Sequence, residues 1–175
     1  MQTPSSILTN IRCHTYEEVL LSNHPTLGEM AAKNEQWHIF TLAYISAGIT
    51  SYLDFVGRRN SMNDAQVAET AELLLEDYRD MKFDDIALFI RNCKKARYGR
   101  LYDLNGSVLL DWFREYDNQR WEVKRRLDKK AHEAEEVQQA VWEKRLGSER
   151  GGKLISIGEI AGDLIDKLKI NTQKL

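Results

Sequence analysis

The sequence predicts an all-α fold: a compact helical bundle with a long charged helix and a linker-tethered C-terminal amphipathic helix. Three observations support this prediction. Only two prolines interrupt the 175 residues, apolar residues recur at spacings of three and four, and capping-box patterns precede several of these stretches. With 42% hydrophobic residues the chain can form one core, and 30% charged residues suit solvated helix faces. We therefore expect a helical domain over residues 1–146, a flexible linker over 147–155 and a helix over 156–175.

Capping boxes mark where helices begin. In this motif an N-cap side chain and the side chain three residues later satisfy each other's backbone N–H groups. The pattern occurs at Thr26 with Glu29 and at Asn63 with Gln66, which predicts a short helix beginning at Leu27 and a second one running to about Arg79.

The stretch from Glu35 to Val56 predicts a central bundle helix, because its apolar residues form a broad face. Its longest apolar run, 39–49, is shorter than the roughly 20 residues that a membrane span requires, so we interpret it as a core helix. A further helix is predicted from Phe83 to about Lys95. Asp84 and Asp85 suit its positive N-terminal end, and we interpret them as helix-starting residues, not as an acid–base pair.

A long helix is predicted from Ser107 to Arg145. Its apolar residues at heptad spacing are Leu109, Phe113, Tyr116, Val123, Leu127, Ala134, Val137 and Val141. Arg120, Lys130 and Lys144 occupy seam positions, where a strict coiled coil would bury charge at a cost. We expect the helix to pack on the body through about Val123 and to continue as an arm or to pair weakly with a partner.

Glycines and Ser148 predict the linker after residue 146, followed by an amphipathic helix. The candidate protein-binding residues lie on its apolar face: Ile157, Ile160, Leu164, Ile165 and Leu168. Such a helix docks on its own body, on a second copy or in another protein's groove.

The net charge of −2 hides an asymmetry. Residues 1–90 have a balance of −7, residues 91–130 have a balance of +6, and the remainder is nearly neutral. The basic region contains a glycine-rich turn with tyrosines, a combination in which cations neutralise phosphates and aromatic rings stack on unpaired bases. The candidate nucleic-acid contacts are Lys94, Lys95, Arg97, Tyr98, Arg100, Tyr102, Arg114, Lys124 and Arg125. Arg120 could extend the positive strip. In the alternative interpretation both tyrosines pack inward and the cations are only solvated.

Catalytic and metal-binding signatures are missing from the sequence. The four histidines are far apart, and Cys13 and Cys93 stand alone, so we expect no metal, no cofactor and two reduced, inert thiols. There is no phosphate loop, dinucleotide fingerprint or nucleophile elbow, so we expect no enzyme activity. Residues 1–11 lack the pattern of a secretory signal, and we expect a cytoplasmic protein without a membrane partner.

Four short segments carry a resemblance to a family. Met62–Val67, Lys82–Ile86, Tyr98–Asp103 and Trp112–Phe113 resemble a family of small uncharacterised proteins of bacteria, their mobile elements and phages. The resemblance covers about a third of the chain and implies a phage or mobile-element setting without a mechanism. The helical layout is also similar, more weakly, to phage replisome organisers and helicase loaders.

Three functional hypotheses remain open. The first is a non-enzymatic accessory protein that contacts nucleic acid and a protein partner, in replication for example. The second is a structural, assembly or adaptor protein, including a homo-oligomer, that acts through helix–helix contacts. The third is an inhibitor of a host enzyme or defence system.

Overall fold

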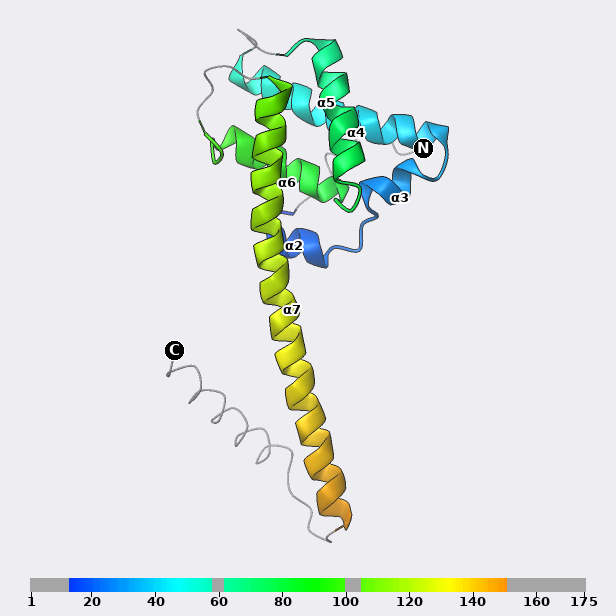
Figure 1. Cartoon of the computed structure of the whole chain (residues 1–175), viewed down its shortest axis with the longest axis vertical. Helices are drawn as coiled ribbons and strands as arrows, with labels where there is room; N and C mark the ends of the chain where they lie inside the picture. Colours follow the sequence, from blue (N-terminus) through cyan, green and yellow to red (C-terminus); the bar gives the residue numbers. More distant parts are fainter. Residues whose placement is uncertain (1–12, 58–61, 100–104, 151–175) are drawn as a thin grey trace. The chain divides into compact units, whose positions relative to one another are not determined.

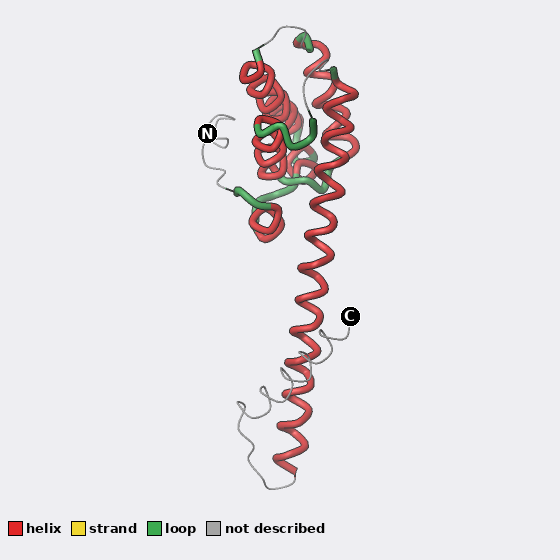
Figure 2. The backbone as a smooth tube through the Cα atoms, turned by 90° about the vertical axis from the view of Figure 1, so that its left-hand side faces the viewer, coloured by secondary structure: helices red, strands yellow, loops and turns green. Residues whose placement is uncertain are grey.

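The computed structural model describes residues 13–57, 62–99 and 105–150, with side chains described up to residue 145. In these ranges the chain forms helices and no strand, which confirms the all-α class (Figures 1 and 2). An isolated antiparallel bridge joins Thr26 to Lys82. The helices are α2 (Tyr16–Leu21), α3 (Leu27–Ala31), α4 (Glu35–Val56), α5 (Asp64–Asp77), α6 (Phe83–Lys94) and α7 (Gly106–Arg150).

Local signals explain where these helices begin. Two predicted capping boxes are confirmed: Thr26 with Glu29 opens α3, and Asn63 with Gln66 opens α5. A third one, predicted at Ser156 with Glu159, lies outside the described residues. The predicted bounds of α4 agree with the structure. The short helix α2 was not predicted, although Thr15 caps it by accepting a hydrogen bond from the backbone N–H of Glu18.

The described residues fall into two units that divide between Lys124 and Arg125, within the continuous helix α7. In the first unit, α4 packs against α3, α5 and α6. Buried residues of α7 end at Val123 in the described part of the chain, which confirms the prediction that the helix packs on the body to about this point. In the second unit, α7 continues through Gly147 and Ser148 to Arg150, so helix replaces the first residues of the predicted linker.

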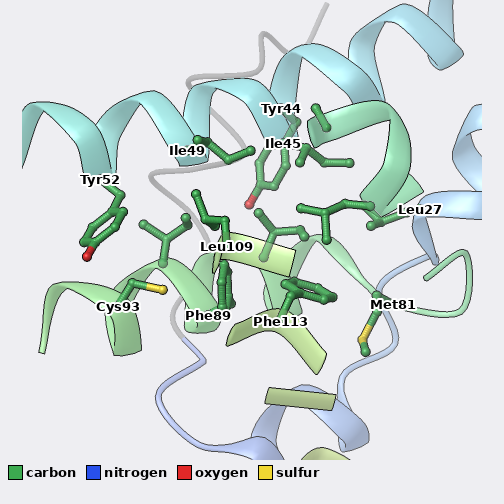
Figure 3. Packing of buried hydrophobic residues seen from close by; sticks show 14 of the residues in the cluster. Leu27, Tyr44, Ile45, Ile49, Tyr52, Met81, Phe89, Cys93, Leu109 and Phe113 are labelled. Atoms are coloured by element: carbon green, nitrogen blue, oxygen red, sulfur yellow. The ribbon is translucent and has the colours of Figure 1, made fainter. Parts of the chain in front are cut away.

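The core of the first unit forms where α4, α6 and α7 meet. Figure 3 shows side chains of α4 pointing toward those of α6 and α7: Tyr44, Ile45, Ile49, Tyr52, Phe89, Cys93, Leu109 and Phe113. The Tyr44 hydroxyl donates to the backbone oxygen of Phe83, so this buried polar group is satisfied. Aromatic pairs such as Phe89 with Phe113, at 4.8 Å between ring centroids, add edge-to-face contacts to the core.

By length and hydropathy alone, α4 could cross a membrane. A core helix passes the same test, and seven residues of α4 are buried within the first unit. Its contacts with α3, α5 and α6 are those of a central bundle helix.

Candidate functional site

The basic segment predicted to contact nucleic acid begins at the C-terminal end of α6. The helix ends in a Schellman-type turn: the N–H of Arg97 donates to the oxygen of Asn92, and Ala96 has a φ of 53°. This turn leaves Lys95 and Arg97 exposed. Lys94 lies along α4, with its Nζ 2.8 Å from the Ser51 Oγ.

Tyr98 is half-buried and packs against the core, the inward position that the alternative interpretation expected. Its ring stacks on Phe89 at 5.7 Å between centroids and lies 6.4 Å from Trp112. Its hydroxyl accepts a hydrogen bond from the Asn92 amide and lies 3.4 Å from the hydroxyl of Tyr16. Because its ring is used in these contacts, we remove Tyr98 from the candidate nucleic-acid contacts. Arg100 and Tyr102 lie outside the described residues.

The candidate cations on α7 differ from one another in their neighbours: a carboxylate, an aromatic ring or solvent. Arg114 pairs with Asp111 at 2.9 Å, and both side chains are about two-thirds exposed. The Nζ of Lys124 lies 4.6 Å from the centroid of the Trp121 ring, and Arg125 is exposed.

Arg120 does not extend a positive strip. Its side chain is 6% exposed and pairs with Asp85 and Asp80, each at 3.1 Å. The predicted strip from the α6 turn along α7 is therefore not continuous in the described residues. The charge of Arg120 is visible in the sequence but its partners are not, because Asp85 of α6 and Asp80 of the preceding loop meet it only in the tertiary structure.

Asp84 and Asp85 are the least expected feature of the first unit, since both are fully buried. Asp85 starts α6 by accepting from the backbone N–H of Lys82, as predicted. It also accepts from the Tyr116 hydroxyl at 2.7 Å and pairs with Arg120. Burial raises the pKa of Asp85, and the positive charge of Arg120 opposes that shift.

Asp84 joins two further side chains. It lies 2.7 Å from the Nδ1 of His24 and accepts a hydrogen bond from the Cys13 thiol at 3.2 Å. Burial and the neighbouring Asp84 raise the pKa of Cys13 to about 11, whereas a nucleophilic cysteine needs a lowered pKa. We therefore interpret this cluster as structural. Nowhere in the described ranges do three His, Cys, Asp or Glu side chains form a group that could hold a metal ion.

Lys82 fixes α2 against this network. Its Nζ donates to the backbone oxygens of Val19 and Leu20, both at 3.1 Å, and to that of Ser22 at 2.5 Å. These carbonyls form the C-terminal end of α2, which a cation stabilises.

From Lys124 onward, α7 offers a surface of a different kind. Residues 124–130 contain five basic residues and one acidic residue, and residues 131–143 contain four acidic residues and no Lys or Arg. We call these the basic block and the acidic block of α7. Leu127, Ala134, Val137 and Val141, which we call the α7 seam, continue the heptad pattern, and none of them is buried. Trp142 beside them is 56% exposed.

The candidate protein-binding residues of the C-terminal segment lie outside the described residues. Comparison with known proteins identified no matching family model, no matching curated protein and no matching solved structure. The resemblance to the phage and mobile-element family therefore stays a prediction.

Proposed function

We propose that this protein is a non-enzymatic assembly protein that acts through helix–helix contacts of α7, with a second copy of the chain as the partner. One observation carries the proposal: the apolar heptad pattern of α7 continues through Val141, although burial ends at Val123 in the described residues. Apolar residues at heptad spacing on a solvated helix are typical of a surface that pairs with another helix.

The charge pattern of α7 favours a second copy in antiparallel orientation. In that orientation the basic block of each copy faces the acidic block of the other, and the two-fold axis passes near the junction of the blocks. A parallel pair would bring the two basic blocks together, which is unfavourable. The seam is short and contains Lys130, so association is expected to depend on protein concentration.

Light scattering over a concentration series tests this proposal. The expected result is a mass that rises from monomer to dimer, together with weaker association at high salt, because the block contacts are solvent-exposed. A monomer at every concentration would contradict the proposal.

A matched pair of variants locates the contact. Val137→Asp places a charge in the seam and is expected to abolish dimer formation. Gln139→Asp adds the same charge two residues after Val137, on another face of the helix. This variant is expected to leave the dimer intact. Equal effects of the two variants would exclude the seam as the contact.

Charge reversal tests the orientation. Arg126→Glu with Lys129→Glu reverses part of the basic block and should weaken the dimer. Adding Glu133→Lys and Glu136→Lys to the same chain restores opposite charges between these positions of the two blocks and should restore the dimer. If the combined variant associates no better than the basic-block variant alone, the antiparallel arrangement is wrong.

Nucleic-acid binding is a second candidate function, favoured by the exposed cations of the basic block. Arg125, Arg126, Lys129 and Lys130 are exposed within two turns of α7, and Lys124 is half-buried against Trp121. Lys129 also lies 3.7 Å from Glu133, so part of this charge is offset. A site of this kind neutralises phosphates and reads no sequence.

Gel-shift titration on single-stranded and duplex DNA at two salt concentrations tests the second candidate. Binding at low salt that weakens with added salt, and that is lost in the Arg125→Glu, Arg126→Glu variant, would support it. Absence of binding at low salt would remove it.

A further inference from the structure

A groove lies between α4 and α6, and none of its described lining residues belongs to α7. Its volume is about 350 Å³, and its floor is formed by Ala47, Gly48, Ile86, Ala87 and Ile90. This floor is apolar and made largely of small side chains, so an occupant can approach the two helix backbones closely.

The small residues also explain why the groove forms here. A Cβ at Gly48 would lie 3.3 Å from side-chain atoms of both Ile86 and Ile90, so α4 and α6 approach closely at this point. Two turns along α4, Phe55 remains 63% exposed, a high value for a large apolar side chain.

One end of the groove is positively charged. Arg91 and Lys94 line it, and among its described lining residues there is no carboxylate. Lys94 is held in place by Ser51 and by the Phe55 ring, whose centroid lies 5.7 Å from the Nζ. Arg91 also donates to the backbone oxygen of Cys13, at 3.4 Å. Asp54 is the nearest acidic neighbour in sequence on α4 and does not line the groove.

We propose that this groove binds an acidic amphipathic helix of a partner protein. Apolar side chains one turn apart on that helix would contact the floor, and carboxylates beside them would pair with Lys94 and Arg91. An isolated anion would leave the apolar floor unused, and a purely apolar helix would leave the two cations unpaired. An amphipathic helix bound in the groove would contact the apolar floor and would also pair with the two cations.

A fluorescent synthetic peptide tests the proposal. The probe is an amphipathic helix with Leu and Ala on one face and Glu on its flanks, and the comparison peptide has Lys in place of each Glu. Fluorescence anisotropy with the full chain should show saturable binding of the acidic peptide and at least about tenfold weaker binding of the basic one.

Neighbouring lysines give a matched pair of variants. Lys94→Glu should weaken binding of the acidic peptide by at least about tenfold, and Lys94→Gln should have a smaller effect in the same direction. Lys95→Glu makes the same charge change one residue away, outside the groove, and should change the affinity by less than about threefold. Circular dichroism of each variant checks that the helical fold is retained.

Several results would overturn the proposal: no saturable binding of the acidic peptide, equal binding of the two peptides, or equal losses in Lys94→Glu and Lys95→Glu. Binding of anionic lipid vesicles without binding of the peptide would overturn it too and would assign the groove to a membrane surface. The α7 variant Val137→Asp should bind the acidic peptide with unchanged affinity, so failure of the assembly proposal leaves this one standing.

Discussion

At the scale of single residues, the buried carboxylates and their partners distinguish this bundle from one held only by apolar packing. Asp84 and Asp85 open α6, and each has no exposed surface. Asp85 accepts hydrogen bonds from the Tyr116 hydroxyl and the backbone N–H of Lys82, and it forms an ion pair with Arg120. Removing Arg120 is costly, because the buried charge of Asp85 is left without its ionic partner.

Arg120→Met is therefore expected to lower the free energy of unfolding by about 3–5 kcal/mol, the typical cost of leaving a buried charge unpaired. Arg114→Met, which breaks the exposed pair with Asp111, should cost at most about 1 kcal/mol. Chemical denaturation of the two variants gives both values. Similar costs for the two variants would mean that the Arg120 pair contributes no more than a surface ion pair.

The Cys13 thiol provides a pH-dependent prediction. Its pKa is raised from an ordinary value of 9.0 to about 11 by burial and by Asp84. The rate of its alkylation by iodoacetamide, followed by mass spectrometry of the Cys13 peptide, should therefore keep rising to about pH 11. The unfolded thiol ionises first as pH rises, so Cys13 should also lower the free energy of unfolding between about pH 9 and 11. An alkylation rate that levels off near pH 9 would show that the thiol is not perturbed.

At the scale of elements, each described helix begins where local chemistry allows it, but the end of α6 goes against local preference. Ala96 adopts a φ of 53°, a left-handed conformation that costs an L-residue with a Cβ roughly 1–2 kcal/mol. The Schellman-type hydrogen bonds at this turn, together with the inward packing of Tyr98, hold it in place.

Ala96→Gly is expected to stabilise the protein by about 1 kcal/mol, since glycine adopts this conformation without strain. The matched control is Ala68→Gly on the exposed face of α5, which should destabilise it by about 1 kcal/mol through the lower helix propensity of glycine. Thermal or chemical unfolding measures both. A destabilising effect of Ala96→Gly would show that the strain is smaller than the backbone entropy that glycine adds to the unfolded chain.

At the scale of the whole molecule, the two units of the chain are stabilised differently. The described core residues lie between Val19 and Val123, so the first unit contains the whole described core. From Arg125 to Arg145 no described side chain is buried, and the helix is held by its own backbone and by local pairs such as Lys129 with Glu133.

A chain ended after Lys130 should therefore unfold cooperatively, with a Tm within about 4 °C of the full-length protein measured at a concentration where both are monomers. The same truncated chain should fail to dimerise, because it lacks most of the α7 seam. Differential scanning calorimetry and light scattering measure the two properties. Loss of cooperative unfolding would show that residues after 130 contribute to the core.

Local signals allowed much of the fold to be predicted. The capping boxes at Thr26 and Asn63, the bounds of α4 and the last packed position of α7 near Val123 all follow from residues close together in sequence. The candidate site was harder to predict. The basic segment was visible as composition, but composition does not show which cations have carboxylates from other helices beside them.

The sequence by itself determined the all-α class and most helix boundaries, because capping and apolar periodicity act over a few residues. Only the tertiary structure decided that Tyr98 packs inward, that Arg120 is buried against Asp85, and that α4 and α6 enclose a groove with cations at one end. These outcomes depend on contacts between residues far apart in the sequence, such as Tyr16 with Tyr98, which are 82 positions apart. Such contacts form only when the helices have packed. They join side chains that belong to no common local motif, so the choice of partner is made in the core as a whole.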